Sequence, residues 1–156
     1  MPPLKIYVAG AASAAPMIKS SIIERLKTIG HHITFDWTEH VQYTAAPDLE
    51  YMQRCAAHDT EGACTADLLL IYMDTPRSYA YRGSFTELGM GLALGKKIII
   101  VRDAAPQDEH ITIGTNPERV VFYHHPSIEH VATLDEAFTL IERHALSSQP
   151  RMNIVE

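Results

Sequence analysis

Two uninterrupted apolar runs constrain the fold of this chain more strongly than any other feature of its sequence. Residues 68–72 read Leu-Leu-Leu-Ile-Tyr and residues 98–101 read Ile-Ile-Ile-Val. A strand that is apolar at every position is typical of a parallel sheet, because helices cover both faces of such a sheet and bury both sides of each strand. Most of the segment between the runs, residues 82–97, has apolar and glycine residues at helical spacing. We therefore expect a strand, a helix and a second strand, in that order.

Strands and helices alternate along the rest of the chain. The alternation predicts a parallel sheet with right-handed crossovers, and five strands favour the flavodoxin-like order 2-1-3-4-5. We thus expect an α/β, Rossmann-like three-layer sandwich that forms one domain over residues 1–156, with a loose tail from about residue 147. Beyond the two runs above, the predicted strands are residues 5–9, 33–35 and 120–123, and the predicted helices are residues 16–29, 48–57, 59–66 and 134–145.

Composition argues against several classes of partner. The chain has 13 Lys and Arg against 19 Asp and Glu, a formal net charge of -6, and no basic run of the kind that binds a nucleic-acid polymer. No apolar stretch approaches the ~18 residues of a membrane span, and Met1, Pro2 and Pro3 lack a signal-like apolar core. Cys55 and Cys64 are too few for a disulfide framework, so we expect reduced thiols in a cytoplasmic protein.

Glu87 is the first candidate for a functional residue. Ligands of open parallel sheets bind at the carboxyl ends of the strands, where the chain reverses direction between strands 1 and 3. This geometry indicates the loop after Ala9, the loop after Met73 and the start of the helix that carries Glu87. The helix dipole and free N–H groups would keep a carboxylate there ionised, as a charged nucleophile or a ligand to a positive centre. The alternative is that Glu87 only stabilises the first helical turn.

The sequence does not match the common cofactor and metal motifs. Residues 10–15 follow the first strand but lack the three-glycine dinucleotide fingerprint, and residues 91–97 lack the Ser or Thr that follows the lysine of a phosphate-binding loop. The histidine pairs at residues 31–32 and 124–125 place neighbours on opposite faces of an extended chain, which suits surface positions better than a shared ion. No Cys or His spacing matches a structural zinc site. We expect no cofactor and no metal.

Four other residues have both a functional and a structural interpretation, and a fifth, Asp59, has only a structural one at this point. Trp37 follows the second strand and either stacks on a heterocycle or packs in the core. Tyr7 lies in the first strand, as an ordinary core residue or as a hydroxyl that holds a carboxylate in place. Asp74 ends the third strand, as a second catalytic carboxylate or as a loop cap. Arg82 either carries substrate charge or is solvated, and the spacing of Asp59 alone indicates a helix cap.

Three segments together resemble the nucleoside 2-deoxyribosyltransferase family and its nucleotide N-glycosidase relatives. They are Lys-Ile-Tyr-Val-Ala-Gly at residues 5–10, Asp-Thr-Glu-Gly-Ala-Cys-Thr-Ala-Asp at residues 59–67 and Gly-Ser-Phe-Thr-Glu-Leu-Gly at residues 83–89. The last two, in this order and at this separation, are fairly specific, and the resemblance runs over roughly residues 4–145. It implies an enzyme that acts on the N-glycosidic bonds of nucleosides, with a nucleoside and a nucleobase as its partners.

The resemblance implies a role for each matching residue. Glu87 falls on the family's nucleophile, Asp59 on the aspartate that helps to protonate the base or position the sugar, and Tyr7 on the tyrosine that orients the nucleophile. It thereby favours Asp59 over Asp74 as the partner of Glu87. The residues expected to contact substrate are Gly10, Trp37, Asp74, Arg82, Gly83, Ser84 and Asn116, the last contributed by a neighbouring subunit of a homo-oligomer with shared active sites.

The implied reaction exchanges the nucleobase of a 2′-deoxynucleoside through a covalent glycosyl-glutamate intermediate, with retained configuration. Two features depart from the family pattern. Tyr81 stands where transferases have an aspartate six residues before the nucleophile, and residues 10–15 lack the basic side chain of relatives that cleave monophosphates. Two alternatives therefore stay open: an N-glycosidase that hydrolyses nucleosides or their 5′-monophosphates, and a non-catalytic nucleotide-binding module. Base selectivity is expected to depend on the loops at residues 38–47 and 104–116.

Overall fold

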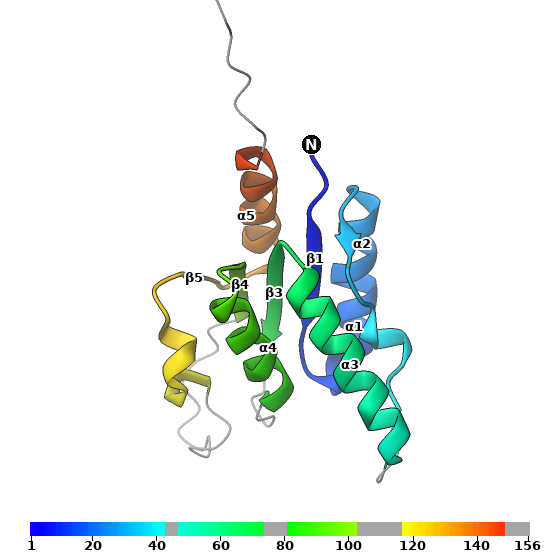
Figure 1. Ribbon diagram of the computed structural model, residues 1–156. Helices are drawn as coiled ribbons and strands as arrows, with labels where there is room; N and C mark the ends of the chain where they lie inside the picture. The colour runs from blue at the N-terminus through cyan, green and yellow to red at the C-terminus, as the bar shows by residue number, and fades with distance from the viewer. Residues whose placement is uncertain (43–46, 74–80, 103–116, 149–156) are drawn as a thin grey trace, which may run out of the picture.

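The sheet of this protein has five parallel strands in the order β2-β1-β3-β4-β5. A computed structural model describes residues 1–42, 47–73, 81–102 and 117–148, and Figure 1 shows helices on both sides of the strands. The expected α/β three-layer fold and its strand order are confirmed. The strands are β1 (Lys5–Ala9), β2 (His32–Ile33), β3 (Leu68–Met73), β4 (Lys97–Arg102) and β5 (Ile128–Val131).

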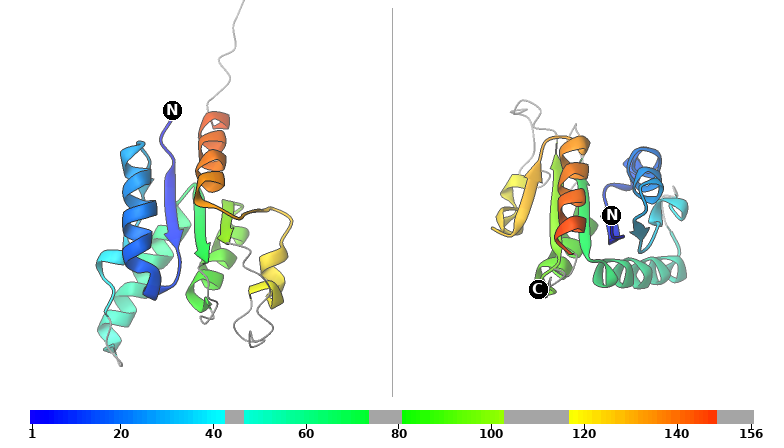
Figure 2. Two further views of the ribbon diagram at one scale, coloured as in Figure 1. Left: turned by 180° about the vertical axis from the view of Figure 1, so that it is seen from behind. Right: turned by 90° about the horizontal axis from the view of Figure 1, so that it is seen from above.

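The α-helices of the described residues are α1 (Ala15–Ile18), α2 (Glu24–Thr28), α3 (Leu49–Thr65), α4 (Arg82–Ala93) and α5 (Leu134–Ser147). They divide between the two faces of the sheet, as Figure 2 shows from above. Ile6, Leu70 and Ile99 pack in one core layer with α1, α2 and α5, whereas Tyr7 and Leu69 lie in the other layer with residues of α3 and α4. This division follows from strand geometry, because successive side chains point to opposite faces.

The two apolar runs form the central strands, as the sequence predicts. Every residue of β3 except Tyr72 is buried, and β4 is buried from Ile98 onward. Tyr7 of β1 pairs with Leu69 of β3, which in turn pairs with Ile98 of β4. This register places the Tyr7 ring in an apolar row beneath α3 and α4.

The first helical segment agrees with the prediction, and the second strand is shorter than predicted. α1 and α2 are joined by a wider π-helical turn, η2 (Lys19–Ile23), and the segment ends at Gly30, whose φ of 98° is left-handed. β2 covers two residues rather than the predicted 33–35. The Thr34 N–H still donates to the Ile6 carbonyl at 3.0 Å, but Phe35 leaves the sheet and lines a pocket.

The prediction of two short helices at residues 48–57 and 59–66 is wrong, because α3 is one helix of 17 residues. Asp48 caps it as expected, with its side chain accepting a hydrogen bond from the Tyr51 N–H at 2.7 Å. Thr60 and Gly62 lower helix propensity locally, yet tertiary packing outweighs a cost of about 1 kcal/mol per glycine. Asp59 therefore lies in the middle of a helix and does not cap one.

The predicted strand at residues 120–123 is also wrong. Residues Val121–His124 form a short 3-10 helix, η6, and the fifth strand is β5, which the sequence analysis did not identify. β5 is the last strand of the described sheet and only partly buried, so its Ile-Glu-His-Val sequence carries little apolar signal. The predicted last helix is confirmed as α5, while the tail from residue 149 lies outside the described residues.

Candidate active site

A cavity of about 420 Å³ lies at the carboxyl end of β1, between α3, α4 and residues 35–42. Small-molecule sites commonly have volumes of ~300–1,000 Å³. Gly10 and Ala12 line the cavity just after β1, and Gly83 and Ser84 line it from the first turn of α4. The cavity thus occupies the crevice where open parallel sheets bind ligands.

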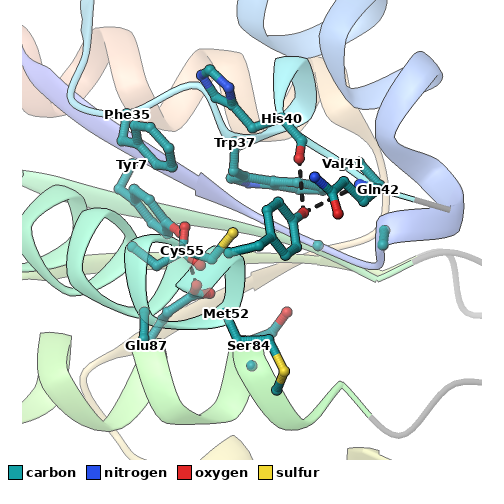
Figure 3. Close-up of a pocket in the computed structure, with 16 residues that line it drawn as sticks. Tyr7, Phe35, Trp37, His40, Val41, Gln42, Met52, Cys55, Ser84 and Glu87 are labelled. Carbon is teal, nitrogen blue, oxygen red and sulfur yellow. Dashed lines mark hydrogen bonds between the residues drawn. The ribbon is translucent and has the colours of Figure 1, made fainter. Parts of the chain in front are cut away.

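Three of the expected residues meet in this cavity. The Tyr7 hydroxyl lies 2.8 Å from Glu87 Oε1 and 3.0 Å from Asp59 Oδ1. Tyr7 comes from β1, Asp59 from the middle of α3 and Glu87 from α4. Figure 3 shows the Tyr7 ring directed toward Glu87 within the pocket. The carboxyl groups of two helices are therefore held on either side of one buried hydroxyl.

Gly62 allows Tyr7 to lie this close to α3. A β-carbon at Gly62 would be 2.8 Å from Tyr7 Cδ2 and 2.9 Å from Phe35 Cβ. Both distances are shorter than a carbon–carbon contact of ~3.5–4.0 Å. The glycine in the middle of α3 thus has a steric role, because the helix backbone rests directly on the tyrosine that contacts both carboxyls.

Burial dominates the electrostatics of the site. Burial raises the pKa of Glu87 to about 8, more than the Tyr7 hydrogen bond lowers it, and the neighbouring Asp59 carboxyl raises it further. Burial likewise raises the pKa of Asp59, against the opposing effects of the Tyr7 hydrogen bond and of His58. The expectation that the helix dipole keeps Glu87 ionised is wrong. Glu87 lies five residues after the start of α4, beyond the first turn in which the dipole acts.

Proton counting restricts the charge states of this cluster. The Tyr7 hydroxyl has one proton but contacts two carboxyl groups, so it can donate to only one of them. The second contact becomes a hydrogen bond only when the other carboxyl is protonated and donates to the Tyr7 oxygen. If both carboxyls were ionised, Tyr7 could donate to one of them only. Its oxygen would then lie against the other carboxylate with no proton between the two oxygens, and such an unpaired contact away from water is unfavourable. The geometry therefore fits two carboxyls that share one proton.

Aromatic side chains form the other end of the cavity. Phe35, Trp37, His40 and Tyr51 line it, and Phe35 stacks on His40 with ring centroids 5.6 Å apart and planes inclined by 3°. The Trp37 Nε1–H donates to the Val8 carbonyl at 2.7 Å, which holds the indole against the end of β1. Such an arrangement suits a planar heterocycle, because aromatic faces stack on one another.

The start of α4 contributes small residues to the pocket. Ser84 is only 3% exposed, and its Oγ has no hydrogen-bond partner among the described residues. A buried hydroxyl of this kind is costly unless a ligand or water satisfies it. Arg82 is exposed at the helix start, outside the part of the pocket lining that the structure describes. Tyr81 is fully buried with a left-handed φ of 49°.

The structure places most, but not all, of the expected residues. Tyr7, Gly10, Trp37, Asp59, Gly83, Ser84 and Glu87 line one pocket. Asp74 and Asn116 lie outside the described residues, as does the loop at residues 104–116.

Sequence reasoning missed Tyr51 and Cys55, which line the pocket from the same helix as Asp59. Their signal is the spacing of four residues between Tyr51, Cys55 and Asp59, which puts all three on one helical face. Splitting the helix at residue 58 concealed this pattern.

The residues that the structure describes contain neither a metal site nor a membrane-spanning helix. No group of three or more His, Cys, Asp or Glu side chains is arranged to hold a metal ion there. Within the same residues, no helix has the length and apolar character needed to cross a membrane.

Comparisons with known proteins give matches to one family and to solved structures. A family model described as nucleoside 2-deoxyribosyltransferase matches residues 6–120, whereas no curated protein gives a significant match. The crystal structure of a conserved protein from Enterococcus faecalis is 18% identical, with a TM-score of 0.65 over 91% of this chain and 99% of that chain. The structure of a CMP N-glycosidase from Clostridium botulinum is 15% identical, with a TM-score of 0.53 over 90% of this chain and 98% of that chain. At these identities the two likenesses show the fold.

Proposed function

The chain belongs to the nucleoside 2-deoxyribosyltransferase family, and we propose that it exchanges the nucleobase of a 2′-deoxynucleoside through a covalent intermediate on Glu87. The observation that carries the proposal is the Tyr7 hydroxyl held between the Asp59 and Glu87 carboxyls in a cavity of about 420 Å³. We assign nucleophilic attack to Glu87, proton transfer to Asp59 and orientation of Glu87 to Tyr7.

The first half of the reaction uses the shared proton. In the reactive arrangement Tyr7 donates to an ionised Glu87, and a protonated Asp59 donates to the Tyr7 oxygen. A Glu87 oxygen attacks the anomeric carbon, and the electron pair of the breaking glycosidic bond goes to the base nitrogen. That base takes the proton of Asp59 and leaves neutral. The sugar is then an ester of Glu87, on the face opposite the departed base.

The second half reverses these steps with another base. A nitrogen of the incoming base attacks the anomeric carbon, the glycosyl–Glu87 bond breaks, and Asp59 accepts the proton of the incoming base. Two inversions give net retention of configuration. When water attacks in place of a base, the product is the free sugar, so hydrolysis is the competing outcome at the same site.

Charge supports a nucleoside over a 5′-monophosphate as the substrate. The pocket residues that the structure describes include two carboxyls, Asp59 and Glu87, and no Lys or Arg. A phosphate dianion placed there would meet negative charge without a guanidinium or ammonium partner. The buried Ser84 hydroxyl suits a neutral sugar hydroxyl, which would satisfy its missing hydrogen bond.

Chromatography of the products tests the proposal. The protein is incubated with a deoxynucleoside, with and without a different free base. Formation of a new nucleoside supports transfer, and release of base without an acceptor identifies a hydrolase. Failure to change a panel of nucleosides and monophosphates would rule out glycosyl transfer and leave a nucleotide-binding module.

The pH dependence of kcat/KM is expected to be bell-shaped, with its descending limb near pH 8. The two carboxyls titrate as a coupled pair, so the pKa of about 8 at Glu87 describes the loss of the last proton of the pair, whichever carboxyl carries it. Above this pH, Asp59 cannot protonate the leaving base, so the rate falls. Below the lower limb, a second proton neutralises the nucleophile. Initial rates from about pH 5 to about pH 10 measure the profile. A rate that rises through pH 8 would instead show that Glu87 acts alone, with no proton from Asp59.

A further inference from the structure

The aromatic end of the pocket belongs to a segment with little regular structure. We call residues 35–42 the wall segment. β2 ends at Ile33, and the wall segment contains only the three-residue 3-10 helix η3 (Trp37–Glu39). A segment of this kind has few backbone hydrogen bonds of its own, so its position depends on ties to neighbouring elements.

The first half of the wall segment is held by contacts with η2 and β1. The Lys19 ammonium is paired with Asp36 and Glu39, and the Trp37 indole N–H donates to the Val8 carbonyl. These ties hold residues 36–39 in place.

Tyr51 ties the second half of the wall segment to α3. Its hydroxyl donates to the His40 carbonyl at 2.7 Å and accepts from the Gln42 N–H at 3.1 Å. In Figure 3 dashed lines mark these hydrogen bonds beside the labelled His40 and Gln42. In contrast to Tyr7, this hydroxyl has one donor and one acceptor, so both contacts are satisfied at once. Tyr51 also lines the pocket itself.

α3 connects this tie to the reacting groups. Tyr51 precedes Asp59 by two helical turns on the same face of α3, a distance of about 12 Å at a rise of about 1.5 Å per residue. One rigid helix therefore fixes the separation between the wall segment and the proton donor. A base bound against the wall segment would then be held at a set distance from Asp59.

We propose that Tyr51 is a positioning residue, whose hydroxyl holds the wall segment where it binds the planar heterocycle of a nucleobase. This proposal rests on the proposed function and adds to it the place of the base. The sugar lies beside the Asp59 and Glu87 carboxyls and the start of α4, and the base lies between the wall segment and α3.

Tyr51→Phe tests the proposal, because it keeps the ring and removes both hydrogen bonds. The KM for the acceptor base is expected to rise about tenfold, as two modest hydrogen bonds are lost, while kcat falls no more than about twofold since Asp59 and Glu87 keep their positions. Thr65→Val is the matched control. It removes a hydroxyl that bonds the Glu61 carbonyl at 2.8 Å on the same helix, away from the pocket, and it should leave KM unchanged.

Trp37 gives a second readout that needs no turnover. It is the chain's single tryptophan, and its carbonyl accepts a hydrogen bond from the N–H of His40 at 3.0 Å, so its fluorescence reports on the half of the wall segment that Tyr51 holds. Tyr51→Phe should increase quenching of Trp37 by acrylamide and weaken its response to added adenine or cytosine, and Thr65→Val should change neither. Unchanged KM and quenching in Tyr51→Phe, or equal changes in both variants, would overturn the proposal. If the wild type turns over no nucleoside, the proposed function fails, and the fluorescence arm still decides whether Tyr51 holds a base-binding wall.

Discussion

Glu87→Gln is expected to reduce nucleobase exchange by about 10³-fold or more, because an amide oxygen is a poor nucleophile toward the anomeric carbon. The variant keeps the size of the side chain and the hydrogen bond from Tyr7, so nucleoside binding should change little. Rapid quenching of the wild type during turnover, followed by peptide mass analysis, should find the glycosyl adduct on the peptide that contains Glu87. Glu87→Gln should give no adduct. A variant that exchanges bases at the wild-type rate would exclude Glu87 as the nucleophile.

The same substitution has a measurable effect on stability, with a defined sign. The pKa of Glu87 is about 8 in the folded protein against an ordinary value of 4.5, so the folded state binds the proton more tightly than the unfolded state. This contribution to stability is fully present below about pH 4.5 and is lost as pH rises through about 8. Glu87→Gln cannot ionise and should lose less stability over that range. Urea unfolding of both proteins at several pH values measures the difference.

Hydrophobic pattern predicts most of this fold because it records burial directly. The runs at residues 68–72 and 98–101 are apolar since both faces of β3 and β4 are covered, and the order of strands follows from the crossovers. β5 escapes the same reasoning. Its residues pair with β4 alone among the described strands and include Glu129 and His130. The strand is only partly buried, so its sequence has a weak hydrophobic pattern.

The candidate site was predicted in part, and the reason differs from residue to residue. Glu87 could be located from strand order alone, because the carboxyl ends of the strands mark the crevice. Asp59 could not, since local propensity around Thr60 and Gly62 suggests a helix boundary that tertiary packing overrides. The sequence also did not predict that the pKa of Glu87 is raised, because the cause is burial of the side chain in the folded protein.

Gly62 explains both the wrong helix prediction and the geometry of the site. Its missing side chain lowers the helix propensity of the sequence, and the same missing side chain leaves room for the Tyr7 ring. Glycine is about 0.5–1 kcal/mol less favourable than alanine inside a helix. In α3 that cost accompanies the close approach of the Tyr7 ring, so sequence propensity and site geometry conflict at one residue. Such conflicts are expected at functional sites.

Gly62→Ala should therefore lower kcat by about 10²-fold, although alanine is the better helix former. Its β-carbon would lie 2.8 Å and 2.9 Å from Tyr7 Cδ2 and Cε2, and 2.9 Å from Phe35 Cβ. The Tyr7 side chain is fully buried, so it can move only by displacing its neighbours, and either α3 or Tyr7 must shift. A displacement of about 1 Å between the hydroxyl and either carboxyl is enough for a loss of this size. Steady-state kinetics with saturating deoxynucleoside and base measure the effect.

Gly89→Ala separates this steric effect from helix propensity. Gly89 lies within α4, is exposed, and a β-carbon there would meet no atom within 4 Å. Alanine at this position should raise stability by about 0.5–1 kcal/mol and leave kcat unchanged. In Gly62→Ala the same gain is offset by overpacking of about 1–3 kcal/mol, so that variant should be neutral to mildly destabilised while its activity falls. Wild-type kcat in Gly62→Ala would show that the reaction does not depend on where α3 holds Tyr7.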